Sequence, residues 1–177
     1  MLSGNETMFQ AGAQGGPRLE LELISSHARF AGSVSLGAYS RLSDLLNFHD
    51  EVLTVANGVI LTRTGFRSAD EAAQLDIRLP DLTLVIDRSG YVPPVPDGEQ
   101  MVEKRPYRLL AVTDAHIITG NFYIYAGAEP GPYLRAAEPR WVPITDVRVR
   151  SLVDRRIKFG ASFAVLHRKP LLAFSVI

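Results

Sequence analysis

Two expected strands of the C-terminal half carry tyrosines and arginines on the face opposite their apolar residues. This follows because successive side chains of a strand point in opposite directions. Aromatic rings interleaved with guanidinium groups can stack bases and bind phosphates, and the same residue types are enriched in protein–protein hot spots. The competing interpretation is the ordinary solvated face of a sheet. The predicted binding residues are Tyr123, Tyr125, Arg148, Arg150, Arg155, Arg156 and Lys158.

The sequence contains no recognisable catalytic or metal-binding motif. It has no cysteine, and its four histidines (His27, His49, His116 and His167) lack the paired spacing that a single metal ion favours. Asp114 precedes His116 at an expected hairpin turn, where aspartate is common for conformational reasons. We therefore predict no catalytic residue, no metal site and no cofactor. An enzyme would need a pocket between the two halves near His116 or His167.

The composition is that of a globular protein, with 46% apolar and 21% charged residues among 177. Residues 1–17 are rich in Gly, Gln and Ala and have no basic start or apolar core, so we expect a flexible tail and no secretory signal. The longest apolar runs are far shorter than the ~20 residues that span a bilayer. These features, with the lack of cysteine, favour a soluble cytoplasmic protein that does not bind membranes.

The net charge of zero hides two oppositely charged halves. Residues 1–103 contain 7 basic and 14 acidic side chains, whereas residues 104–177 contain 12 basic and 5 acidic ones. Surfaces of opposite sign attract one another between molecules, and a head-to-tail contact then closes a ring or propagates a filament.

The two halves also match each other when the chain is shifted by 88 residues. Residues 19–25 then align with 107–113, and residues 30–36 align with 118–124, with a glycine at the same place in the second pair. One insertion later, residues 53–57 match 142–146. The order and spacing of these segments predict an internal duplication.

The expected elements of each half are strand, strand, short helix, strand and strand, which predicts a mainly β fold of two small barrels or sandwiches. The predicted organisation is a tail at 1–17, an acidic repeat at 18–95, a linker at 96–105 and a basic repeat at 106–177. Ser40 is the expected N-cap of the first helix, and its leucines recur at i, i+3 and i+4. Strands are expected at 52–63 and 74–87, with Glu20 and Glu22 facing solvent on the first strand. Whether the repeats share one core or form two barrels stays open at this point.

The stretch Arg41-Leu-Ser-Asp-Leu-Leu-Asn47, after the glycine-containing strand, resembles an uncharacterised bacterial domain family that carries an R-L-S-D-x-L-N motif. The likeness covers about 60 residues of the first half and implies a β-rich domain type with no assigned activity. The second half departs from it, with Gly131–Ala137 in place of the motif. A fainter resemblance to Sm-like barrels lies in Val85-Ile-Asp-Arg88 and Val165-Leu-His-Arg168, before a final apolar strand.

These features together predict a non-enzymatic module that binds another protein or itself, as a head-to-tail oligomer. The alternative is binding of nucleic acid or another polyanion by the basic C-terminal half. The C-terminal strand, Leu171–Ile177, supports the first hypothesis because it is apolar and ends the chain without a polar tail. A bare strand of this kind invites the addition of another strand.

Overall fold

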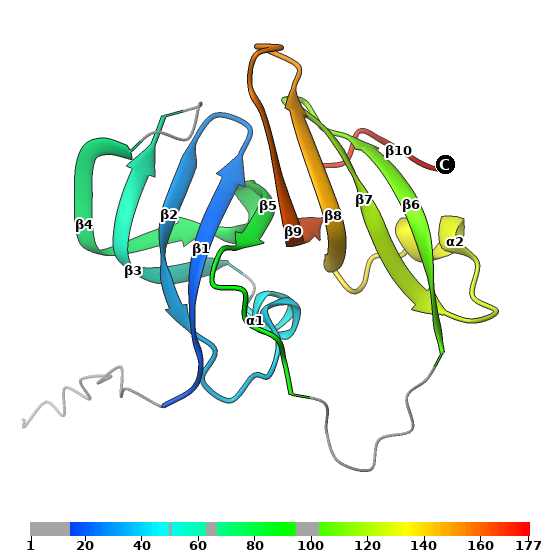
Figure 1. Ribbon diagram of the computed structural model, residues 1–177, viewed down its shortest axis with the longest axis horizontal. Coiled ribbons are helices and arrows are strands. Elements are labelled where there is room, and N and C mark those ends of the chain that lie inside the picture. The colour runs from blue at the N-terminus through cyan, green and yellow to red at the C-terminus, as the bar shows by residue number, and fades with distance from the viewer. Residues whose placement is uncertain (1–14, 50, 63–66, 95–102) are drawn as a thin grey trace, which may run out of the picture.

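A computed structural model describes residues 15–49, 51–62, 67–94 and 103–177. The expected tail lies almost wholly outside these residues, as does most of the expected linker. The fold is mainly β, as predicted, and the strands within these described ranges form a single antiparallel sheet of ten strands (Figure 1).

Each half contributes five strands and one short α-helix to this sheet. The first half contains β1 (Arg18–Ser25), β2 (Arg29–Ser35), α1 (Leu42–Phe48), β3 (Val52–Leu61), β4 (Arg67–Arg78), a 3-10 turn (Leu79–Asp81) and β5 (Leu82–Asp87). The second contains β6 (Lys104–Val112), β7 (His116–Tyr125), α2 (Pro130–Arg135), β8 (Trp141–Ser151), β9 (Lys158–His167) and β10 (Ala173–Val176).

The two halves follow the same path through the sheet. The strand order is β10-β6-β7-β8-β9-β5-β1-β2-β3-β4. Read within each half, the fifth strand lies beside the first, and the second, third and fourth follow in sequence. The halves are joined where β9, the fourth strand of the second half, pairs with β5, the fifth strand of the first.

The same β-bulge interrupts both halves. The register between the second and third strands shifts at Ala31/Ser33 in the first half and at Thr119/Asn121 in the second. The intervening glycines, Gly32 and Gly120, would each place a Cβ atom 3.0 Å from a carbonyl oxygen of the neighbouring strand. The shared glycine thus permits the close backbone approach that a bulge requires.

Across each bulge lies a residue with a left-handed backbone. Asn57 has a φ of 51° and Asp146 a φ of 52°, and these residue types tolerate that conformation better than most. Equivalent residues of the two halves are 88 positions apart from the first strands through the helices and 89 apart from the third strands onward. Origin of the halves by duplication remains a prediction, which this likeness of topology favours.

Several sequence-based boundaries were wrong. The expected strand at 74–87 is two strands, because Pro80 lies in the 3-10 turn that separates β4 from β5. Residues 67–71, which lie between the strands expected at 52–63 and 74–87, belong to β4, and Lys104 and Arg105, expected in the linker, belong to β6.

The first helix is confirmed in type and in its buried leucines, but it begins at Leu42. Its N-cap is Arg41, not Ser40, and no side chain caps it. Burial of Leu42, Leu45 and Leu46 against the sheet therefore fixes this short helix, since tertiary packing supplies most helix stability.

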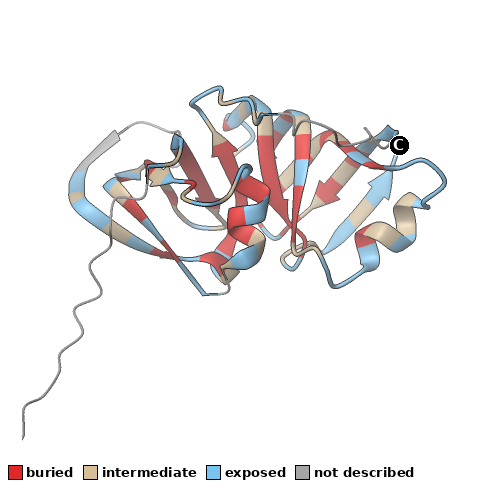
Figure 2. Cartoon of the chain, turned by 90° about the horizontal axis from the view of Figure 1, so that it is seen from below, coloured by how far each residue is buried: buried red, intermediate tan, exposed pale blue. Residues whose placement is uncertain are grey.

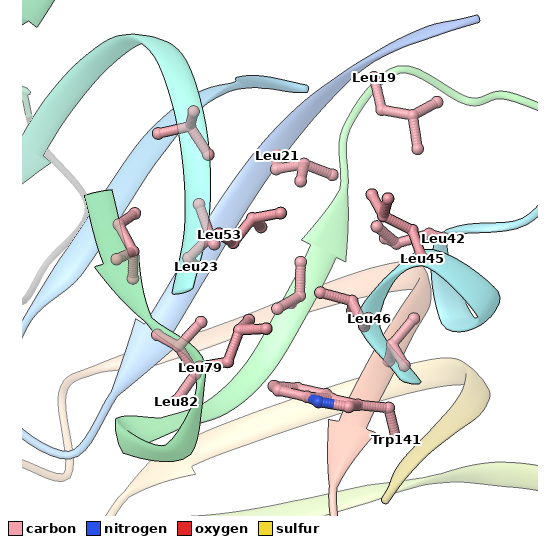
Figure 3. Packing of buried hydrophobic residues seen from close by; sticks show 14 of the residues in the cluster. Leu19, Leu21, Leu23, Leu42, Leu45, Leu46, Leu53, Leu79, Leu82 and Trp141 are labelled. Carbon is pink, nitrogen blue, oxygen red and sulfur yellow. The ribbon is translucent and has the colours of Figure 1, made fainter. Parts of the chain in front are cut away.

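Two hydrophobic cores lie against the sheet, and each takes residues from both halves. Val85 belongs to the first core, whereas its neighbours Leu84 and Ile86 belong to the second. Conversely, Trp141 from β8 joins the first core, beside Leu46, as Figure 3 shows. Because alternate side chains of a strand point to opposite faces, the cores lie on opposite faces of the sheet at the junction.

Candidate functional site

The junction between β5 and β9 is the most completely buried part of the sheet. Its three cross-strand pairs are Leu84 with Leu166, Val85 with Val165 and Ile86 with Ala164. All six residues are buried, so the junction is covered on both faces (Figure 2). Strands buried on both faces have continuous apolar sequences, and this junction is how the protein joins one half to the other.

A buried ion network lies at the same junction. Both Nε and an η nitrogen of Arg88 donate to Glu22 Oε2, at 3.0 and 2.7 Å, and Arg29 donates to Glu22 Oε1. Arg29 stacks over the Phe159 ring at 4.3 Å, and Arg88 donates to the Gly160 carbonyl oxygen at 3.2 Å. The expectation of a solvated Glu22 was therefore wrong, because β9 and its neighbours cover that position of β1.

Among the described residues, no further strand pairs with the outer edges of β4 and β10, which lie at opposite ends of the sheet. β4 is the fourth strand of its half, as β9 is at the junction. β10 is the fifth strand of its half, as β5 is at the junction. The β10 edge is markedly apolar and exposed, with Leu172 72% and Ile177 63% exposed. An unpaired strand edge with exposed apolar side chains is a template for pairing with another chain.

The two edges differ in the sign of their charge. Exposed acids on β4 are Asp70, Glu71 and Asp76, and they outnumber its exposed base Arg78, which pairs with Asp81. Exposed bases beside β10 are Arg108 on β6 and Lys169 in the preceding turn. The edges are thus electrostatically complementary, in agreement with the opposite net charges of the halves.

Three of the predicted binding residues gather around one hollow on the outer face of β7, β8 and β9. Arg148 pairs across strands with Thr119 and Gly160, and Arg150 pairs with Lys158. These residues line a hollow of about 500 Å³. Within the described part of the chain, the side chains of Arg148, Arg150 and Lys158 have no hydrogen-bond or ion-pair partner.

The other four predicted residues lie outside this hollow. Tyr123 is at the far end of β7, where its hydroxyl lies 3.3 Å from Thr145 Oγ1. Tyr125 packs against Lys104, whose Nζ is 5.1 Å from the ring centre.

Arg155 and Arg156 lie in the turn between β8 and β9. Arg156 forms an ion pair with Asp154 at 3.2 Å, which lowers the pKa of that carboxyl, mainly through the side-chain hydrogen bond. The sequence therefore predicted that Arg148 and Arg150 lie together, but it did not predict that Tyr123 and Tyr125 lie apart from them.

The region near His116 leaves very little space between the halves. The hairpin turns after β1 and β6 meet there, and Ser26 Oγ donates to Asp114 Oδ1 at 2.6 Å. The hollow beside them is about 20 Å³, which is room for about one water molecule. Burial lowers the pKa of His116, against an opposing effect of Asp114 and with a smaller lowering effect of Arg29.

His167 is the other buried histidine at the junction. Its Nδ1–H donates to the Leu82 carbonyl oxygen at 3.0 Å, and its ring stacks on Trp141 with centroids 4.4 Å apart. Burial lowers the pKa of His167, although the bond to Leu82 opposes the shift. Both buried histidines thus favour the neutral form.

Sequence reasoning missed Arg168, which follows β9 and is only 8% exposed. One η nitrogen donates to the Tyr133 carbonyl oxygen, and the guanidinium lies 5.7 Å from the Tyr133 ring centre. Nε and the other η nitrogen have no partner among the described residues. A basic residue at the end of an apolar strand gave no signal that distinguished it from an exposed cation.

In the described ranges, no group of three or more His, Asp or Glu side chains could hold a metal ion, and no helix is long and apolar enough to cross a membrane. No family model, curated protein or solved structure matches the chain. The resemblances to a bacterial domain family and to Sm-like barrels therefore stay predictions, and function must be inferred from the surfaces themselves.

Proposed function

We propose that this protein is a self-assembly module whose copies join head to tail, β10 of one copy adding to β4 of the next. The observation that carries the proposal is the β5·β9 junction, where a fourth and a fifth strand already pair inside the chain. The free edges are the remaining fourth and fifth strands. Repetition of the same pairing between copies would extend the sheet without any new type of contact.

The internal junction predicts the register of the external one. With the offset of 89 residues, Leu84, Val85 and Ile86 correspond to Ala173, Phe174 and Ser175. On the other strand, Ala164, Val165 and Leu166 correspond to Leu75, Asp76 and Ile77. The expected intermolecular pairs are thus Ala173 with Ile77, Phe174 with Asp76 and Ser175 with Leu75.

The external contact is expected to be weaker than the internal one. Asp76 stands where the junction has the buried Val165, and Ser175 stands where it has Ile86. Less apolar area is then removed from water, and the exposed charges on both sides contribute more to orientation and association rate than to affinity. We therefore expect association that depends on concentration and weakens with salt.

Sedimentation equilibrium at several concentrations tests the proposal. The Ile177 amide donates to the Arg108 carbonyl oxygen, so the amide of Val176 points away from β6, because amides alternate along a strand. Val176→Pro removes this outward donor at an edge position that tolerates proline, and we expect it to abolish association. Val176→Thr keeps the amide and a β-branched side chain and should associate like the wild type.

A wild type that is monomeric at every concentration and salt would overturn self-assembly. β10 could then pair only with a strand of a different protein. A labelled peptide of residues 70–78 of β4 would not be expected to bind in that case.

A second candidate function is supported by the hollow around Arg148, Arg150 and Lys158. Three cations without partners on adjacent strands suit the phosphates of a single-stranded nucleic acid or another polyanion, with an affinity that falls with salt. A fluorescence titration with single-stranded RNA and DNA tests this. The double variant Arg148→Ala, Arg150→Ala should bind more weakly. The control variant Arg78→Ala should bind like the wild type, because Arg78 lies on β4 and pairs with Asp81. Binding that is absent, or unchanged in the double variant, would exclude this function.

A further inference from the structure

A hollow of about 670 Å³ opens beside α2, close to the free β10 edge. Its apolar lining comes from Leu134 on α2, Leu171 before β10 and Phe174 on β10. Arg168, buried at the end of β9, completes this part of the lining. An apolar hollow with a buried cation at a sheet edge raises the question of what fills it.

The corresponding place in the first half is already filled. The offset between the halves relates Leu134, Arg168, Leu171 and Phe174 to Leu46, Leu79, Leu82 and Val85, respectively. These four residues belong, with Trp141, to one buried cluster, and Figure 3 shows the Trp141 ring beside Leu46. Trp141 is the first residue of β8, the third strand of the other half. The first half therefore has a socket that the start of a third strand fills.

The residue of the first half that corresponds to Trp141 is Val52, at the start of β3. Val52 pairs with Arg78 as Trp141 pairs with His167. Unlike Trp141, which is 1% exposed, Val52 is 43% exposed. An exposed apolar residue therefore lies on one side of the molecule, while an open socket of matching type lies on the other.

Charge supports the same match. The residue before Trp141 is Arg140, whose η nitrogen donates to the Asn47 carbonyl oxygen beside the filled socket at 3.0 Å. The residue before Val52 is Glu51, which is exposed. The open socket is basic, since Arg135, Arg168 and Lys169 line it, and Glu138, the one acid among its described lining residues, already pairs with Arg140 at 3.6 Å.

Arg168 makes an acidic occupant favourable. Its Nε and one η nitrogen are buried without partners in the described part of the chain, and burial lowers its pKa, against opposing effects of Tyr133 and Glu138. A buried charge without a counter-ion is costly. A carboxylate brought near the guanidinium would offset that cost.

We infer that the hollow beside α2 is the socket for Glu51 and Val52 of a second copy of this chain. The inference rests on the proposed head-to-tail assembly and adds to it a side-chain contact next to the paired strands. The second copy's Val52 would lie against Leu134, Leu171 and Phe174, and its Glu51 would face Arg135, Arg168 and Lys169.

The test measures the dissociation constant between copies by sedimentation equilibrium. Glu51→Lys should weaken association about tenfold or more, as loss of a charge partner at an interface does. Combining Glu51→Lys with Lys169→Glu exchanges the two charges and should restore most of the affinity. Val52→Trp copies the internal contact and should tighten association. Glu20→Lys, at an exposed acid on β1 away from both edges, is the matched control and should have little effect.

The outcomes separate the socket from the strand pairing. If the wild type associates and Val176→Pro abolishes association, but Glu51→Lys and Val52→Trp change nothing, the socket is wrong and the strand pairing stands. If the wild type does not associate, both fail. A Glu51→Lys defect that the charge exchange does not repair would also overturn the contact with the basic lining. Circular dichroism of each variant confirms that it is folded.

Discussion

The side-chain amide of Asn47 pairs with the backbone of Trp141, 94 residues further along the chain. Its Nδ2 donates to the Trp141 carbonyl oxygen at 2.9 Å, and its Oδ1 accepts from the Trp141 amide at 2.9 Å. The last turn of α1 thereby holds the first residue of β8, and Trp141 is held with its ring in the first core. The two halves are joined by this side chain as well as by the strands β5 and β9.

Asn47→Ala should destabilise the protein by about 1–3 kcal/mol, because it leaves a largely buried amide and carbonyl of Trp141 without their partner. The midpoint of urea unfolding, followed through the fluorescence of Trp141, the single tryptophan, measures the effect. Asn47→Asp keeps the acceptor and loses the donor, so it should fall between the wild type and Asn47→Ala. An unchanged midpoint in Asn47→Ala would contradict this role.

Glu22→Gln should destabilise the protein more, by about 3–5 kcal/mol, since it removes the buried carboxylate with which Arg29 and Arg88 both pair. Arg29, which is 7% exposed, is the more buried of these two arginines. Glu20→Gln, on the same face of β1 but exposed, is the control and should shift the urea midpoint little. Equal shifts in the two variants would show that the network adds nothing to stability.

Stability should fall as the pH drops below about 6.5, the ordinary pKa of histidine. Burial lowers the pKa of both His116 and His167 in the folded protein, so the unfolded chain binds protons more readily between the folded and unfolded pKa values. The contribution of these histidines is complete above the unfolded pKa and is lost as the pH falls toward the folded one. The positive charges of Arg140 and Lys169 near His167 act in the same direction as burial.

Urea midpoints at pH 7.5 and 5.5 measure this dependence. His167→Gln can still donate to the Leu82 carbonyl oxygen but does not titrate, so it should reduce the difference between the two midpoints. His27→Gln, at an exposed position in the turn after β1, should leave the difference unchanged. A wild-type midpoint that is the same at both pH values would contradict the account.

Local patterns predicted most of the fold. Alternating apolar residues located nearly all the strands, and the leucine spacing of 42–46 located α1, because both patterns report which side faces a core. The shift of 88 residues also predicted the position of Gly32 and Gly120, since only glycine allows the backbone approach at each bulge. Pro80 could have indicated the break between β4 and β5, as could the alternating Leu and Ile residues, which lie at odd positions up to Leu79 and at even positions from Leu82.

Contacts between the halves could not be predicted from those patterns. Glu22 has the spacing of a solvated residue on an amphipathic strand, and only the pairing of β5 with β9 buries it. Arg148 and Arg150 were expected together because they are two residues apart on one strand. The distance of Tyr123 from them depends on how far along β7 it lies, and Arg168 becomes buried only through the placement of α2.

The most direct test of the central claim is disulfide cross-linking between copies, which the absence of native cysteine makes clean. Ser175 and Leu75 are expected to face each other as a pair that does not exchange hydrogen bonds, with Cα atoms about 4.5 Å apart. The chain carrying Ser175→Cys and Leu75→Cys should therefore form, on mild oxidation, a ladder of covalent oligomers that collapses to monomer on reduction. The chain carrying Ser175→Cys and Asp76→Cys places the second thiol on the opposite face of β4 and should give far less product. Monomer alone in the first variant, or equal ladders in both, would contradict head-to-tail pairing of β10 with β4.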